Sequence, residues 1–207
     1  MELSELKDLI EEALKDCEEK LDGEPEIVLS EADLERLVCW SIMNRLGHND
    51  YQMPKPGDFT VHTQVSHYAD NRSCPDARVD ILLLTKEGMK NATCNELKGY
   101  KYIADSFALE LKYFHANDSI SKIKTIWSDY SKRDYLDSNS WLYVVALLES
   151  DDDDDYKKKK GLIEAMKDEM NNQCPDYNDR LFCHVLRKDK VDWSKFEKQG
   201  AKNQNNE

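Results

Sequence analysis

The sequence predicts an α/β protein with a mixed central sheet and helices on both faces. Apolar residues recur at helical spacing in two N-terminal segments, Leu3–Leu21 and Glu31–Leu46. Five later runs have the alternating or continuous apolar pattern of strands, and two more helical segments separate the last of them. The expected order is helix, three strands, helix, strand, helix and strand, preceded by an extra N-terminal helix.

The two N-terminal helices are bounded by clear signals. Gly23 and Pro25 end the first, an acidic amphipathic helix over residues 1–24, while Ser30 caps the second and Gly47 stops it. Packing on its own domain is the expected fate of the first helix. A protein partner or a second subunit is the alternative cover for its apolar stripe. Residues 25–197 are expected to form one domain, followed by a disordered tail.

The later elements follow from apolar runs and turn residues. Trp141–Leu148 is nearly all apolar, which predicts a central strand covered on both faces. Residues 88–106 are expected to be a hairpin arm or an irregular excursion, and 198–207 the tail. The other expected elements are strands Phe59–Tyr68, Val79–Thr85, Phe107–Phe114 and Arg180–Arg187, helix Ser119–Tyr135, and a loop at Asp151–Asp155 running into a helix to about Asn172.

Composition narrows the class of protein. No run approaches the roughly 20 apolar residues of a membrane span, so no membrane association is expected. The six cysteines lack zinc-ligand spacing, which favours reduced thiols and a cytoplasmic location. The net charge of −13 opposes binding to nucleic acid, but residues 1–35 hold 14 acidic and 3 basic side chains. The rest of the chain is nearly neutral and has locally basic stretches.

Charged residues inside two apolar runs are the best indication of function. Glu110 and Lys112 lie within FALELKYF, and strand alternation places both side chains on one face. Asp80 opens a second apolar run, RVDILLLT. Because burial of unpaired charge is costly, these side chains need a role. Two carboxylates and a lysine at the ends of neighbouring strands could hold a divalent metal and orient a water beside it.

This arrangement resembles the restriction-endonuclease-like, or PD-(D/E)xK, nuclease superfamily over roughly residues 30–150. The family has an acid on its first core helix, an Asp on one strand, and a Glu and a Lys on the next. Matched position by position, these are Glu35, Asp80, Glu110 and Lys112. The resemblance implies a mixed central sheet flanked by helices, and the activity of a DNA endonuclease.

The resemblance also implies a mechanism. Asp80, Glu110 and the backbone carbonyl of Leu111 would bind Mg²⁺, for which Mn²⁺ can substitute, because hard oxygen ligands suit these ions. Lys112 would act beside the attacking water, and Glu35 would bind a second metal or orient that water. The reaction would be in-line hydrolysis of a phosphodiester, stabilised mainly by the metal.

Several assignments stay open in the sequence. The literal Pro-Asp pair contains Asp76 rather than Asp80, and Glu31 shares a helix face with Glu35. Another E-x-K, at residues 96–98, lacks a flanking apolar run and is better explained as a turn or hairpin. Arg78, Lys132 and Tyr113 are candidates for contact with substrate.

A second function also stays open: a catalytically inactive nuclease-like module that binds a protein or nucleic acid. DNA is the expected partner of the active form. A homodimer is expected if both strands of the duplex are cut.

Overall fold

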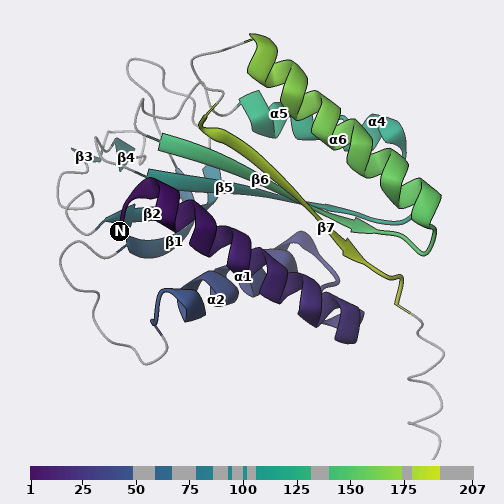
Figure 1. Cartoon of the computed structure of the whole chain (residues 1–207), viewed down its shortest axis with the longest axis horizontal. Helices are drawn as coiled ribbons and strands as arrows, with labels where there is room; N and C mark the ends of the chain where they lie inside the picture. Colours follow the sequence, from purple (N-terminus) through teal and green to yellow (C-terminus); the bar gives the residue numbers. More distant parts are fainter. Residues whose placement is uncertain are drawn as a thin grey trace, which may run out of the picture.

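The computed structural model describes residues 1–48, 59–66, 78–85, 93–94, 100–101, 106–131, 140–173 and 179–191. A five-stranded sheet in the order β1-β2-β5-β6-β7 forms its centre (Figure 1). Its strands are β1 (Phe59–Ser66), β2 (Arg78–Thr85), β5 (Ser106–Phe114), β6 (Ser140–Glu149) and β7 (Leu181–Lys188). A separate two-stranded sheet pairs β3 (Thr93–Cys94) with β4 (Tyr100–Lys101).

The central sheet is mixed, as the sequence predicts. β1, β2 and β5 are antiparallel neighbours, whereas β5, β6 and β7 run parallel. The parallel strands are connected by helices, because a parallel neighbour requires a crossover. The order of elements expected from the sequence is therefore confirmed. Within residues 88–106, for which the sequence predicts a hairpin arm or an irregular excursion, β3 and β4 form an antiparallel pair.

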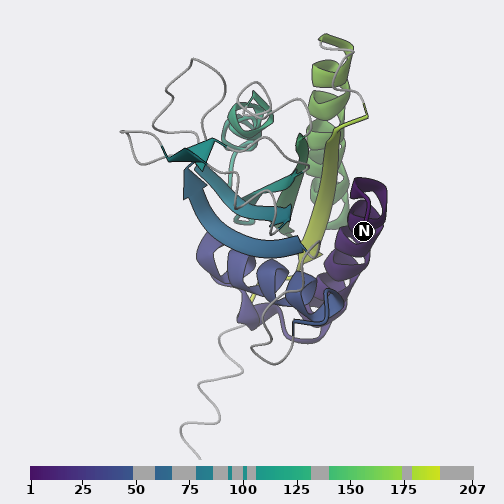
Figure 2. The ribbon, with the colours of Figure 1, turned by 90° about the vertical axis from the view of Figure 1, so that its left-hand side faces the viewer.

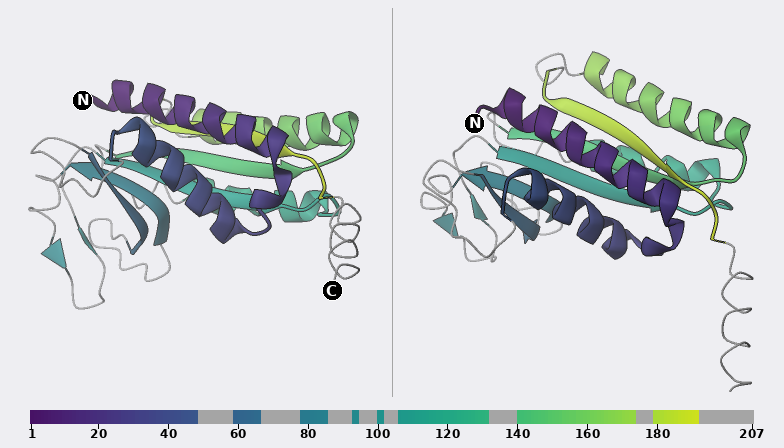
Figure 3. Two further views of the ribbon diagram at one scale, coloured as in Figure 1. Left: turned by 90° about the horizontal axis from the view of Figure 1, so that it is seen from below. Right: turned by 60° about the horizontal axis from the view of Figure 1, so that its bottom comes forward.

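Helices cover both faces of the sheet (Figure 2). On one face lie α1 (Leu3–Gly23) and α2 (Glu31–Arg45), side by side, with the short 3-10 helix η1 (Pro25–Ile27) between them in sequence (Figure 3). On the other face lie α4 (Ile120–Ile123), α5 (Ile126–Ser131) and α6 (Asp153–Gln173). None of the described helices is long and apolar enough to cross a membrane.

The N-terminal helix is part of the main core. One face of α1 is fully buried against α2 and the sheet, and this face includes Leu6, Ile10 and Leu14. The acidic residues of α1 lie outside this face, so its charge and its packing use different sides of one helix. The α2 helix begins with Ser30 accepting the Asp33 N–H and ends at Gly47, whose φ of 74° suits glycine.

The prediction of one continuous helix over Ser119–Tyr135 is wrong. The chain forms two short helices, α4 and α5, with a turn at Lys124 and Thr125. In this turn the Thr125 N–H and hydroxyl both donate to the Lys122 carbonyl, which replaces α-helical bonding with a tighter turn. The loop predicted at Asp151–Asp155 is also shorter than expected, since α6 already begins at Asp153.

Candidate functional site

The central sheet opens between β2 and β5. These strands pair only as far as Ile81 and Leu109, whereas β5 continues beside β6 up to Phe114. No described strand covers the exposed edge of β5 beyond Leu109. The backbone groups of alternate residues point to the same edge of a strand, so those of Leu111 and Tyr113 face the opening.

Carboxylates accept both backbone N–H groups at this opening. The Leu111 N–H donates to Asp80 Oδ2 at 2.8 Å, and the Tyr113 N–H donates to Glu31 Oε2 at 3.3 Å. Asp80 comes from β2 and Glu31 from the first turn of α2. The Leu111 carbonyl faces the same edge as its N–H, so a neutral oxygen atom also faces the opening.

Gln64 connects the second acid of α2 to Asp80. Its Nε2 donates to Glu35 Oε2 at 2.7 Å and to Asp80 Oδ1 at 3.4 Å. Gln64 has a φ of 55° within β1, and it is the one non-glycine residue of the described chain with a positive φ. Gln64 is not among the site residues that the sequence predicts. The feature of the sequence that could have indicated Gln64 is its position on the polar face of β1, the strand next to the one that carries Asp80.

Lys112 lies between two carboxylates from opposite sides of the sheet. Its Nζ is 3.7 Å from Glu31 Oε2 and 3.6 Å from Asp129 Oδ2 of α5. The Lys112 side chain is 28 % exposed and the Asp129 side chain 7 %, so Lys112 remains accessible from solvent while Asp129 is buried. Asp129 therefore joins the surroundings of Lys112, although its helical position alone would suit an exposed ion pair.

Glu110 is the most deeply buried of the predicted acids, at 1 % exposure. Alternation along β5 places it on the same face as Lys112, the face covered by α4, α5 and α6. The β2–β5 pairs end at Ile81 and Leu109, one residue before Asp80 and Glu110 are reached. Asp80 and Lys112 have contacts at the opening, and Glu110 lies two residues from Lys112 on the same face of β5.

Both Glu31 and Glu35 have contacts at this opening. Glu35 contacts it through Gln64, and Glu31 contacts it through Lys112 and the Tyr113 N–H. They lie one helical turn apart on the same face of α2. The opening thus receives two acids from one helix.

The other residues that the sequence singles out lie at the start of β2, in the core, or outside the described residues. Arg78 is exposed at the start of β2. Tyr113 is 7 % exposed and points to the face opposite Lys112, in the core beneath α1 and α2. Asp76, residues 96–98, Lys132 and the tail 198–207 lie outside the described residues.

The opening contains oxygen atoms of carboxylates and a carbonyl but, among the described residues, no preformed cluster of metal ligands. Within the described ranges, no three His, Cys, Asp or Glu side chains are grouped so that they could hold a metal ion. The oxygen donors present are Asp80, Glu35 and the Leu111 carbonyl, and the Gln64 amide separates the two carboxylates. All of these are hard donors of the kind that Mg²⁺ requires.

A cavity of about 360 Å³ borders this region on the surface of α2. Its lining includes Glu35, Thr63, Arg36, Trp40 and Met43. Trp40 is 49 % exposed, with Lys20 Nζ 3.8 Å from the centre of its ring. Glu35 thus belongs both to this partly apolar cavity and, through Gln64, to the opening.

No protein-family model, curated protein or solved structure matches this chain. The proposed function therefore rests on the geometry of the site.

Proposed function

We propose that this chain is a Mg²⁺-dependent nuclease of the restriction-endonuclease-like type that hydrolyses phosphodiester bonds in DNA. The observation that carries the proposal is the composition of the sheet opening. Contacts at the same break in the sheet involve Asp80 of β2, Lys112 of β5, Glu31 and Glu35 of α2 and Asp129 of α5, so carboxylates outnumber the one lysine. Such an excess of negative charge favours a bound cation.

Asp80, Glu110 and the Leu111 carbonyl would hold the metal, with Glu35 as a further acid. When bound, Mg²⁺ would polarise the phosphate and lower the pKa of a coordinated water. The Gln64 amide would have to turn or move away from Asp80, because its donor hydrogens face the oxygens that a cation needs. An amide can turn in this way, presenting its oxygen in place of its nitrogen.

Lys112 would act on the nucleophile. Its contacts with Glu31 and Asp129 are 3.7 and 3.6 Å long, so a water or a phosphate oxygen can approach the ammonium more closely than either acid does. The two acids hold the side chain in the opening. From there the ammonium could orient the attacking water and offset the charge that develops on the phosphate.

Substitution of Lys112 tests the proposed chemistry. Cleavage of supercoiled plasmid by Lys112→Ala should fall at least about 100-fold, because the group that acts on the water is lost. The matched control is Lys124→Ala, which removes an exposed lysine from the turn between α4 and α5. Cleavage by the Lys112 variant at the parent rate would contradict the assigned role.

The metal can be tested without activity. Saturating Mn²⁺ should raise the melting temperature of the parent protein, since a ligand at 100 times its Kd stabilises the folded state by about 2.7 kcal/mol. Asp80→Asn should remove this shift, while Asp154→Asn, at an exposed position in the first turn of α6, should retain it. A parent protein that shows no shift would argue against a metal site.

A binding module without activity is the second candidate. The observation in its favour is the exposed apolar surface on α2, where Trp40 and Met43 are 49 % and 38 % exposed and line one cavity. Neighbouring α1 adds negative charge, so this surface would suit a protein partner with basic residues. A folded parent protein with neither a Mn²⁺ shift nor cleavage would favour this function.

A further inference from the structure

A second cavity, of about 420 Å³, lies at the C-terminal ends of the three parallel strands. Its polar walls come from the segment after β5, from Glu149 at the end of β6, and from Lys188 and Lys190 at and after the end of β7. Open α/β sheets commonly bind ligands beyond the carboxyl ends of their parallel strands. The volume is within the range of small-molecule sites.

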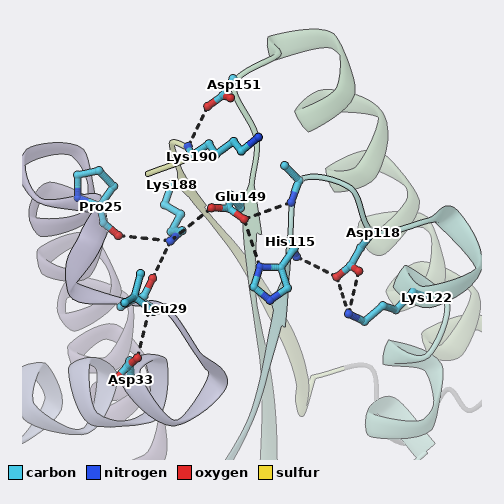
Figure 4. A network of polar contacts seen from close by, with 12 residues as sticks. Pro25, Leu29, Asp33, His115, Asp118, Lys122, Glu149, Asp151, Lys188 and Lys190 are labelled. Atoms are coloured by element: carbon cyan, nitrogen blue, oxygen red, sulfur yellow. Dashed lines mark hydrogen bonds and ion pairs between the residues drawn. The ribbon is translucent and has the colours of Figure 1, made fainter. Parts of the chain in front are cut away.

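The one carboxylate in the lining is already satisfied (Figure 4). Glu149 Oε2 accepts from the Ala116 N–H and contacts His115 Nδ1, both at 3.3 Å. Glu149 Oε1 is 3.7 Å from Lys188 Nζ, and this fully buried ammonium also donates to the Val28 carbonyl at 2.6 Å. The acceptor capacity of the lining is therefore largely used, and a cation would find little to bind.

The unused groups are donors. They are the second ring nitrogen of His115, which donates when the ring is protonated, the side-chain amide of Asn117 and the ammonium of Lys190, all on exposed residues in the lining of the cavity. Within the part of the chain that the structure describes, none of the three has a hydrogen-bonding or ionic partner. Two of them can carry positive charge, in a protein whose net charge is −13.

The loop that carries two of these donors is held in place. The His115 N–H donates to Asp118 Oδ2 at 2.9 Å, and the same carboxylate binds Lys122 Nζ at 2.7 Å. The Lys190 N–H likewise donates to Asp151 Oδ1 at 2.8 Å. The backbone near each donor is thus fixed, which lowers the entropic cost of binding a ligand.

We propose that this cavity binds a small organic phosphate of about mononucleotide size. Lys190, Asn117 and protonated His115, all in the lining, can donate to the terminal oxygens of a phosphate monoester, whose charge of about −1.5 to −2 suits the cationic groups. Leu29, Val191 and the ring of Tyr113 supply apolar walls for the organic part. This site is separate from the sheet opening and does not depend on nuclease activity.

Calorimetry on the full chain in EDTA tests this site without a metal. The ligand is deoxyadenosine monophosphate, with deoxyadenosine and inorganic phosphate as the two partial ligands. The complete nucleotide should bind more tightly than either part. No binding of the nucleotide would overturn the proposal. Equal affinity for deoxyadenosine would overturn the role of the phosphate, and equal affinity for inorganic phosphate would overturn the role of the organic part.

Variants then locate the bound nucleotide. Lys190→Gln should weaken its binding about tenfold, equivalent to 1.4 kcal/mol. Lys158→Gln makes the same change of charge at an exposed position of α6 and should alter affinity less than about twofold. Equal losses in these two variants would overturn the proposal, as would loss of binding in Lys112→Ala with Lys190→Gln unaffected, because the nucleotide would then occupy the sheet opening.

Discussion

Gln64 holds two carboxylates near each other by donating to both. Glu35 and Asp80 carry like charges, and the Gln64 amide nitrogen lies between their oxygens. The backbone conformation that places it there is unfavourable for a residue with a side chain, by roughly 1 kcal/mol. Such strain persists because the surrounding contacts impose it, and it is often found at functional positions.

Substitution of Gln64 should reverse the usual ranking of glycine and alanine in a strand. Gln64→Gly should be more stable than Gln64→Ala by about 1 kcal/mol, because both lose the side-chain hydrogen bonds but only alanine retains the strain at φ 55°. Urea denaturation of the two variants measures the difference. The same pair of substitutions at Thr63, a neighbour in regular register, should favour alanine. A less stable glycine variant at position 64 would contradict the argument.

The strands and their charged residues could be predicted because their pattern is local. Asp80, Glu110 and Lys112 are conspicuous as charges within apolar runs, and the structure confirms the two strands, β2 and β5, that carry them. The break between α4 and α5 could not be predicted, because Ile120, Ile123 and Ile126 keep their three-residue spacing through the turn. The sequence pattern reports which side chains are buried, and it does not report which carbonyl a threonine hydroxyl will bind.

The partners of the charged residues depend on tertiary structure. Gln64 and Asp129 come from a neighbouring strand and from a helix on the far face of the sheet, and their polar character has many local explanations. Sequence spacing alone therefore identified the strand residues of the site better than the residues that surround them.

The α1 helix should contribute to stability as a core element. Leu14 is fully buried between α1 and its neighbours, so Leu14→Ala should lower the free energy of unfolding by about 2–5 kcal/mol. Leu29→Ala makes the same change at a side chain that is 45 % exposed, and it should cost far less. Chemical denaturation compares the two. Equal effects would show that α1 does not pack as described.

Both layers of the core contain titratable groups that are buried in their neutral form. Burial raises the pKa of the Cys17 and Cys183 thiols from 9.0 to about 11, despite hydrogen bonds with Ser41 and Tyr130 that act in the opposite direction. Burial also raises the pKa of Tyr130 and Tyr143. Lys188 is opposite in sign, because burial lowers the pKa of its ammonium while Glu149 counteracts this. The buried thiols and phenols whose pKa is raised therefore outnumber the one lysine, Lys188, whose pKa is lowered.

The sign of the resulting pH dependence follows from proton binding. Above pH 9 the unfolded chain loses thiol protons that the folded chain keeps, so unfolding releases protons and stability falls as pH rises. For each such thiol the loss approaches about 1.4 kcal/mol per pH unit between pH 9 and 11, and the tyrosines act in the same direction. The lowered pKa of Lys188 has the opposite effect on stability, but it is one group against several.

We therefore expect the stability of the parent protein to decrease steeply from pH 9 to pH 11. Cys17→Ala should make this decrease shallower, because the buried thiol is removed. The same variant should be less stable than the parent at neutral pH. Urea denaturation at several pH values measures the slope for each protein. Leu14→Ala is the matched control, because it also weakens the packing of α1 but removes no titrating group. Its stability should be lower than that of the parent by a nearly constant amount across this range. If Cys17→Ala and Leu14→Ala gave the same slope, the buried thiol would not be a source of the alkaline instability.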